Sequence, residues 1–167
     1  LGLMLALARK IPRSHEYVVG GHWQGPTEPY MTLRGVELSG RNVGIIGLGA
    51  IGLMVSEICH ALGMNVLGYD PYASAVSEGI RRVELDELLM SADFVNVHVP
   101  LTPETGGMLN SKRIGMMKST AFLVSVSDAG VFEGDSLVDA LKQKVIAGAA
   151  LDVFESHPIS PQSPLLA

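Results

Sequence analysis

The stretch Gly47–Gly52 reads GLGAIG, a G-x-G-x-x-G pattern that directly follows the apolar run Val43–Ile46. Gly47 permits a tight turn, and Gly49 lets a pyrophosphate approach the backbone because it carries no Cβ. Gly52 lets the following helix pack closely on the strand. Since the pattern leaves a strand and opens a helix, we expect free N–H groups and the positive helix end to hold phosphates.

An acid follows at the position that this pattern requires. Asp70 ends a second apolar run, Asn65–Tyr69, 18 residues after Gly52. A carboxylate there accepts both hydroxyls of an adenosine ribose and repels the extra phosphate of NADP, so we expect NAD as the cofactor. The alternative is a glycine turn and a strand-end acid that bind no ligand.

The rest of the chain alternates between strand and helix patterns. We expect strands at Asn42–Gly47, Asn65–Tyr69, Gly79–Val83, Asp93–Val99, Ala121–Val126 and Val145–Val153, and helices at Ala50–Leu62, Leu85–Met90, Ser111–Met117 and Asp135–Lys142. This alternation predicts an α/β fold with a doubly wound parallel sheet of the Rossmann type, in the strand order 3-2-1-4-5-6. Ligands bind such sheets outside the carboxyl ends of the strands, which puts Val99 and Pro100 at the cleft. His98 is expected to be a packed histidine rather than a catalyst.

The first forty residues precede this pattern. We expect a helix over Leu1–Ile11 that Pro12 ends, a short helical turn over Ser14–Val19 and an irregular segment over Gly20–Gly40. Residues 1–40 would then form a dimerisation segment, and residues 41–155 the dinucleotide-binding core. Apolar and aromatic side chains without a place in a core mark interfaces, so we expect a homodimer. Alternatively, these side chains pack within the domain's own core.

Composition limits the class of protein. The chain has 167 residues, of which 47% are hydrophobic and 17% charged, so it suits one folded domain and excludes a disordered chain. A net charge of −5 without a basic cluster argues against nucleic-acid binding. The apolar start Leu1–Ala8 is too short to span a bilayer, so we expect no membrane association. The single Cys59 fits a reducing cytoplasm and is expected to be buried rather than nucleophilic.

Four motifs carry a resemblance over nearly the whole chain: GIIGLGAIG at 44–52, GMNVLGYDP at 63–71, DFVNVHVPLTPETGGMLN at 93–110 and AGAALDVFE at 147–155. With these the chain resembles the D-isomer-specific 2-hydroxyacid dehydrogenases, and within them the phosphoglycerate dehydrogenases. The resemblance implies a two-domain subunit whose cofactor domain is inserted into a substrate domain. Because the chain does not begin with Met, we expect it to be a piece of a longer protein that lacks the substrate domain.

The same resemblance implies the cofactor contacts. Ala50 and Ile51 would lie at the pyrophosphate, Asp70 at the adenine ribose and Val99 along the cleft. Further contacts would come from Val126, Ser127, Asp128 and Asp152, the last near the nicotinamide amide. Asp152 alternatively forms only a turn. We assign no metal ligands.

The family's chemistry is hydride transfer between nicotinamide and C2 of a small 2-hydroxy or 2-oxo acid, with an Arg, a Glu and a His as catalytic groups. Here Asp128 occupies the Arg position and His157 the Glu position, and the catalytic His would lie beyond Ala167. Exchange of an Arg for an Asp replaces two charge-assisted hydrogen bonds with repulsion, so we expect this chain by itself to be inactive. Two alternatives are a non-catalytic NAD-binding module, as in the C-terminal-binding corepressors, and a decayed paralogue that only dimerises.

Overall fold

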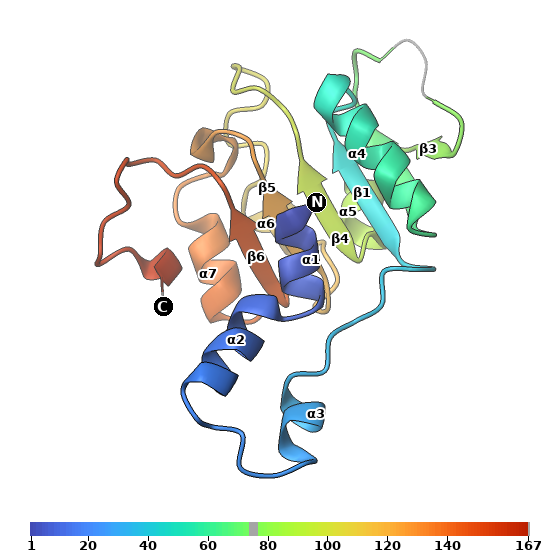
Figure 1. Cartoon of the computed structure of the whole chain (residues 1–167). Coiled ribbons are helices and arrows are strands. Elements are labelled where there is room, and N and C mark those ends of the chain that lie inside the picture. Colours follow the sequence, from blue (N-terminus) through green and yellow to red (C-terminus); the bar gives the residue numbers. More distant parts are fainter. Residues whose placement is uncertain (74–76, 167) are drawn as a thin grey trace.

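The computed structural model describes residues 1–73 and 77–166. Within them one six-stranded parallel sheet has the order β3-β2-β1-β4-β5-β6 (Figure 1). The strands are β1 Asn42–Ile46, β2 Asn65–Tyr69, β3 Ile80–Arg82, β4 Phe94–Val97, β5 Phe122–Ser125 and β6 Gly148–Leu151. The predicted doubly wound α/β topology is confirmed.

Helices cover both faces of the sheet. They are α1 Gly2–Ala8, α2 Ile11–Val19, α3 Glu28–Thr32, α4 Ala50–Ala61, α5 Leu85–Ser91, α6 Ser111–Ile114 and α7 Ser136–Lys142, with 3-10 turns η1 Ala129–Val131 and η2 Pro164–Leu166. α1 and α4 bury Met4 and Cys59 against one face. α5, α6 and α7 bury Leu88, Ile114 and Leu137 against the other. None of the described helices has the length and apolar character needed to cross a bilayer.

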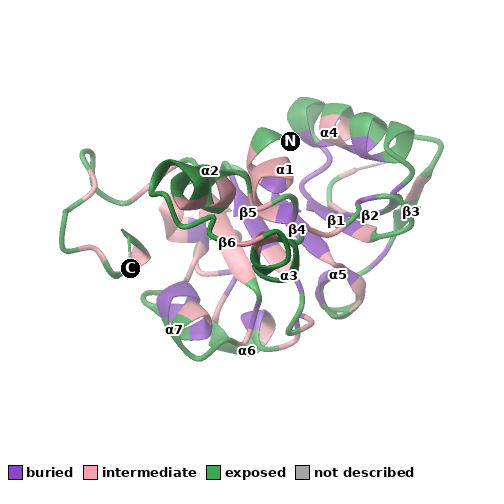
Figure 2. Ribbon diagram, turned by 60° about the horizontal axis from the view of Figure 1, so that its bottom comes forward, coloured by how far each residue is buried: buried purple, intermediate pink, exposed green. Residues whose placement is uncertain are grey.

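The two central strands are buried on both sides, as Figure 2 shows. Val43 and Ile45 of β1 and Val95 and Val97 of β4 have no exposed surface. Parallel strands that are covered on both faces have nearly continuous apolar sequences, and these two segments show that pattern. The parallel pairing brings the carboxyl ends of β1 and β4 to the same edge of the sheet.

Several elements are shorter than predicted, and hydrogen bonds of the neighbouring turns explain this for β6 and α6. β6 begins at Gly148 rather than Val145, because the Val145 N–H donates to the Ala140 carbonyl at 2.8 Å and thereby closes the end of α7. α6 ends at Ile114 rather than Met117, since the Met117 N–H turns back to the Ile114 carbonyl at 3.1 Å. In both cases a turn takes hydrogen bonds that the sequence pattern assigned to a longer element.

The prediction that Pro12 ends the first helix is wrong. α1 already ends at Ala8, and Lys10 adopts a left-handed conformation with a φ of 53°. Pro12 then lies in the first turn of α2, where its missing N–H removes no helical hydrogen bond. The segment Gly20–Gly40 also contains a helix, α3, that its irregular pattern did not predict.

The first forty residues divide into a packed and an unpacked part. α1 lies on β5 and β6, with Met4 and Ala8 buried in the core, so the prediction that this helix lacks a place in the domain core is wrong. By contrast, α2 and α3 extend away from the sheet in Figure 1 and have no buried residue. The large apolar side chains of the first forty residues that are at least half exposed therefore lie on α2, on α3 and on the segment between them.

Candidate cofactor-binding site

The glycine loop joins β1 to α4 at the carboxyl edge of the sheet. Gly47 has a φ of 93°, and a Cβ there would lie 2.7 Å from the His98 carbonyl oxygen. A Cβ on Gly52 would collide with the Gly47 carbonyl. A Cβ on Gly49, by contrast, would meet no atom within 4 Å. The fold therefore requires small residues at Gly47 and Gly52, whereas the space beside Gly49 is open to a ligand.

The loop ends in a helix start that favours anions. Ala50 and Ile51 form the first turn of α4, and both are exposed. The first N–H groups of a helix have no partner within the helix, and the helix dipole places positive potential there. These amides lie next to the open space at Gly49 and fit a diphosphate.

Asp70 ties the second strand to this loop. Its Oδ2 accepts the Leu48 N–H at 2.9 Å, and its Oδ1 accepts the Tyr72 N–H at 2.8 Å. An ionised carboxylate has about four acceptor positions, so both oxygens can still accept hydroxyls. The acid that sequence spacing singled out is thus held against the loop from the neighbouring strand.

Arg82 is a residue of this region that the sequence analysis missed. Its guanidinium donates to the Asp70 carbonyl at 3.1 Å and to the Ala73 carbonyl at 2.8 Å. The sequence offered one signal, an arginine at the end of the strand that was expected beside Asp70.

The other side of the candidate site follows the carboxyl ends of β4 and β5. The Val99 N–H donates to Ser127 Oγ at 3.0 Å, which joins the ends of these strands. Val99 is half-buried and Pro100 exposed at this edge. Both ring nitrogens of His98 are buried without a hydrogen-bond partner in the described residues, and burial lowers the pKa of the imidazole. His98 is therefore held neutral, and no described residue pairs with it for proton transfer.

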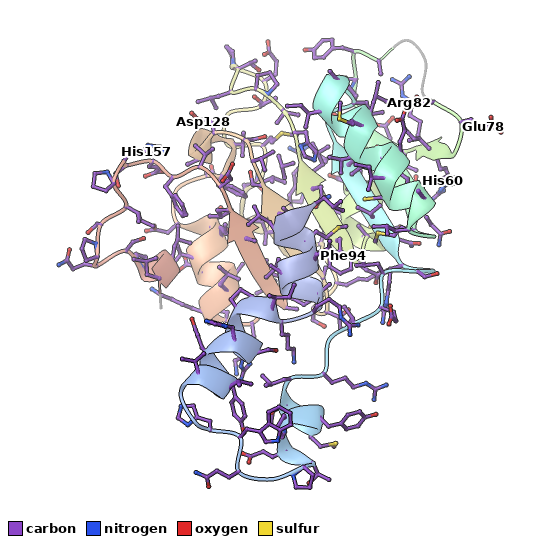
Figure 3. All side chains as sticks on the ribbon, viewed as in Figure 1. His60, Glu78, Arg82, Phe94, Asp128 and His157 are labelled. Carbon is purple, nitrogen blue, oxygen red and sulfur yellow. The ribbon has the colours of Figure 1, made fainter. Side chains whose placement is uncertain are left out.

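In the segment after β5, the acid Asp128 has a structural role. Val126 is exposed, and Asp128 caps η1 because its Oδ1 accepts the Gly130 N–H at 2.8 Å. Asp128 is itself exposed (Figure 3). Asp is a favoured residue at such a cap, whereas an Arg has no acceptor to offer there.

The last two predicted site residues lie further along the chain. Asp152 follows β6, is exposed, and its N–H donates to the Ser125 carbonyl at 3.0 Å, so it lies beside the end of β5. His157 is exposed in the tail (Figure 3). A cavity of about 370 Å³ lies between η1, α7 and this tail, but neither Asp128 nor His157 lines it. The structure does not assemble these two residues into one pocket.

Cys59 lies outside the site. It is fully buried on α4, and burial raises the pKa of its thiol, as suits a core residue rather than a nucleophile.

A glycine loop at a helix start, an acid at the end of the next strand and the switch point between β1 and β4 define a dinucleotide-binding domain of the Rossmann type. The family model for the D-isomer specific 2-hydroxyacid dehydrogenase NAD binding domain matches residues 1–167. The chain belongs to this family and is its NAD-binding domain.

Relatives and solved structures agree with this assignment. The chain is 42% identical to D-3-phosphoglycerate dehydrogenase of Archaeoglobus fulgidus, over 99% of the chain and 31% of that protein. It is 39% identical to glyoxylate reductase of Thermofilum pendens, over 99% of the chain and 50% of that protein. NAD-dependent formate dehydrogenase from Staphylococcus aureus, solved in complex with NAD, has a TM-score of 0.88 and 30% identity, over 97% of the chain and 49% of its own. The chain thus spans about a third to a half of these relatives.

Proposed function

We propose that the glycine loop and Asp70 bind NAD, and that the whole protein transfers a hydride between NAD(H) and a small 2-hydroxy or 2-oxo acid. The observation that carries this proposal is the Asp70 carboxylate, held by the Leu48 N–H at 2.9 Å beside the free helix start. When bound, NAD supplies the nicotinamide ring that accepts or donates the hydride. This chain supplies the phosphate cradle, the ribose acceptor and the cleft along Val99.

The remaining cofactor contacts belong to the same proposal. Ala50 and Ile51 would face the pyrophosphate, and Pro100 would continue the wall of the cleft. Val126, Ser127, Asp128 and Asp152 would lie toward the nicotinamide. Their support is a shared location, since all lie at or beyond the carboxyl ends of the strands.

The carboxylate of Asp70 also favours NAD over NADP. A 2′-phosphate on the adenosine ribose would bring negative charge against a carboxylate that two backbone N–H groups already fix. The repulsion cannot be relieved by rotating the side chain without losing those hydrogen bonds.

Substitution of Asp70 tests the proposal. Asp70→Ala removes the ribose acceptor, and we expect NADH to bind about 10- to 100-fold more weakly, as titration of NADH fluorescence would show. Asp139→Ala is the matched control, because Asp139 is exposed on α7 away from the loop. Equal affinity in the Asp70→Ala variant, or absence of NAD binding by the unmodified protein at millimolar concentration, contradicts the proposal.

One observation favours a second candidate function, an NAD-binding module without dehydrogenase activity. Asp128 stands at the position where the family resemblance implies a substrate-binding Arg, and the structure uses it as a helix cap. His157 stands at the implied Glu position and lies exposed in the tail.

Assays of the whole protein address this second function, because the isolated chain is expected to lack the substrate domain under either function. If the second function holds, the whole protein does not oxidise NADH with glyoxylate or hydroxypyruvate, because an acid at position 128 repels the substrate carboxylate. The readout is NADH absorbance over time, at enzyme concentrations high enough to detect slow turnover. Clear turnover would contradict the proposal of an NAD-binding module without dehydrogenase activity.

We also propose a cytoplasmic homodimer. α2 and α3 present apolar side chains that the domain does not cover, including Val19 at 72% and Met31 at 76% exposure. Surfaces of this kind are typical of subunit interfaces. The cytoplasmic location rests on a single cysteine that is buried and unpaired in the described residues.

A further inference from the structure

Arg82 connects the edge of the sheet to the turn that follows β2. It ends β3 and lies opposite Gly68 of β2 in the parallel register. Its Nη1 donates to the Ala73 carbonyl at 2.8 Å, and its Nη2 donates to the Asp70 carbonyl at 3.1 Å. One guanidinium therefore spans the two ends of the turn from Asp70 to Ala73.

The same turn fixes the acid of the site. The Asp70 carboxylate accepts the N–H groups of Leu48 and Tyr72, so its backbone and its side chain are held at once. The contacts form a chain from Arg82 to the Asp70 carbonyl, and from the Asp70 carboxylate to the glycine loop. An arginine suits this place because its planar fork can donate to two carbonyls in fixed directions.

The neighbouring arginine does not take part. Arg81 precedes Arg82 on β3 and points to the other face, where its Nη1 pairs with Glu87 Oε1 at 3.0 Å. Among the described residues it makes no hydrogen bond or ion pair to the Asp70 turn. The two arginines thus have equal charge and adjacent positions but different partners.

We propose that Arg82 is a positioning residue for the ribose site: it holds the turn after β2 so that Asp70 stays against the Leu48 N–H and faces the cofactor. The inference rests on the proposed binding of NAD at Asp70. Two of the five N–H donors of the guanidinium are directed at these carbonyls. In this proposal Arg82 acts through Asp70 and does not select NADP.

Arginine variants of the full chain test the role by NADH and NADPH affinity. We expect Arg82→Ala to weaken NADH binding about 3- to 10-fold, since it removes two charge-assisted hydrogen bonds at an exposed position. Arg82→Lys keeps the charge but not the fork, and should restore only part of the affinity. Arg81→Ala should stay within about twofold of the unmodified protein. A selective loss of NADPH binding would instead identify Arg82 as a phosphate ligand and overturn the proposal.

Amide hydrogen exchange gives a second readout that needs no cofactor. In Arg82→Ala, the Leu48 amide should exchange about 3- to 10-fold faster, because the carboxylate that accepts it is no longer held. The Ile45 amide in the central strand should keep its rate, which separates local loosening from global destabilisation. An unchanged Leu48 rate overturns the inference.

The two proposals fail in distinguishable ways. If the unmodified protein binds no NADH, the proposed function and this inference both fall. If it binds NADH and Arg82→Ala binds it equally well, only the role of Arg82 is refuted.

Discussion

A Cβ on Gly52 would collide with the Gly47 carbonyl, whereas a Cβ on Gly49 would meet no atom within 4 Å. Both positions belong to one glycine pattern, yet they are small for different reasons. Gly52 is required by the packing of α4 on the strand. Gly49 is required by nothing in the described protein, so its lack of a side chain points to a ligand that approaches the backbone.

This difference predicts that Gly49→Ala mainly weakens cofactor binding, whereas Gly52→Ala mainly lowers stability. Gly49→Ala should cost at most about 1 kcal/mol of the free energy of unfolding, because the new methyl group points into open space and only the weaker preference for alanine at the N-cap of α4 opposes it. It should weaken NADH binding at least about tenfold, since the methyl group occupies the place of the pyrophosphate. Urea unfolding and NADH titration measure the two effects.

Gly52→Ala serves as the counterpart and should lose about 1–3 kcal/mol of stability, because α4 must shift. If Gly49→Ala binds NADH as tightly as the unmodified protein does, the pyrophosphate does not lie at this loop.

At the scale of elements, one acid links the amino-terminal ends of three strands. Asp93 precedes β4; its Oδ2 accepts the Asn42 N–H of β1 at 2.9 Å, and its Oδ1 accepts Lys118 Nζ at 3.0 Å ahead of β5. Burial alone would raise the pKa of Asp93. The Asn42 N–H, Lys118 and Arg41 outweigh that effect, and the net pKa is lowered.

The lowered pKa predicts how stability depends on pH. A carboxyl group whose pKa is lower in the folded state stabilises the protein above its unfolded pKa, and this contribution disappears as pH falls through the folded pKa. Asp93→Asn should therefore cost about 1 kcal/mol at pH 7, and the deficit should shrink as pH falls below about 4. Urea unfolding of both proteins between pH 7 and pH 3 measures this difference.

Asp86→Asn is the matched control. Its pair with Arg113 at 3.4 Å lies in solvent, so we expect a change below about 0.5 kcal/mol. If the stability lost in Asp93→Asn stays constant across the pH range, the lowered pKa of Asp93 is contradicted.

At the scale of the whole molecule, the domain has an uneven surface. α1 completes the core, but α2, α3 and the segment between them are largely exposed (Figure 2). Trp23, Tyr30 and Met31 of this part are all exposed. Isolated apolar side chains on a surface are common, whereas a group on one projecting segment calls for a partner.

We expect this segment to pair with its copy in a homodimer. Met31→Asp places a charge in the expected interface and should shift the protein from dimer to monomer at micromolar concentration, as light scattering would show. Met90→Asp is the control, because Met90 is also exposed but lies on α5, which packs on the sheet face opposite α1 and is not part of the projecting segment. A monomeric unmodified protein would contradict the prediction.

Much of this architecture could be predicted because its signals are local. The alternation of apolar strands with helices is set by neighbouring residues, and β2 was predicted to the residue at Asn65–Tyr69. The spacing from Gly52 to Asp70 likewise depends on a short strand–helix–strand unit that a sequence displays directly. Strand order followed from the handedness of the crossovers.

What escaped prediction depends on contacts between distant segments. Nothing local indicates that Met4 packs in the core beside β4, 92 residues away from Asn96, whose Nδ2 lies 3.8 Å from the Met4 sulfur. The position of Pro12 at a helix start was decided by the left-handed Lys10, and the role of Arg82 by a turn on the adjacent strand.

The sequence by itself determined the class of fold, the glycine loop and the place of Asp70 on the next strand, because each depends on periodicity and spacing within one βαβ unit. Tertiary structure alone decided that α1 is core while α2 and α3 are surface, that Asp128 caps a turn, and that Arg82 donates to the Asp70 carbonyl. The physical reason is that burial and hydrogen-bond partners are properties of segments that only folding brings together.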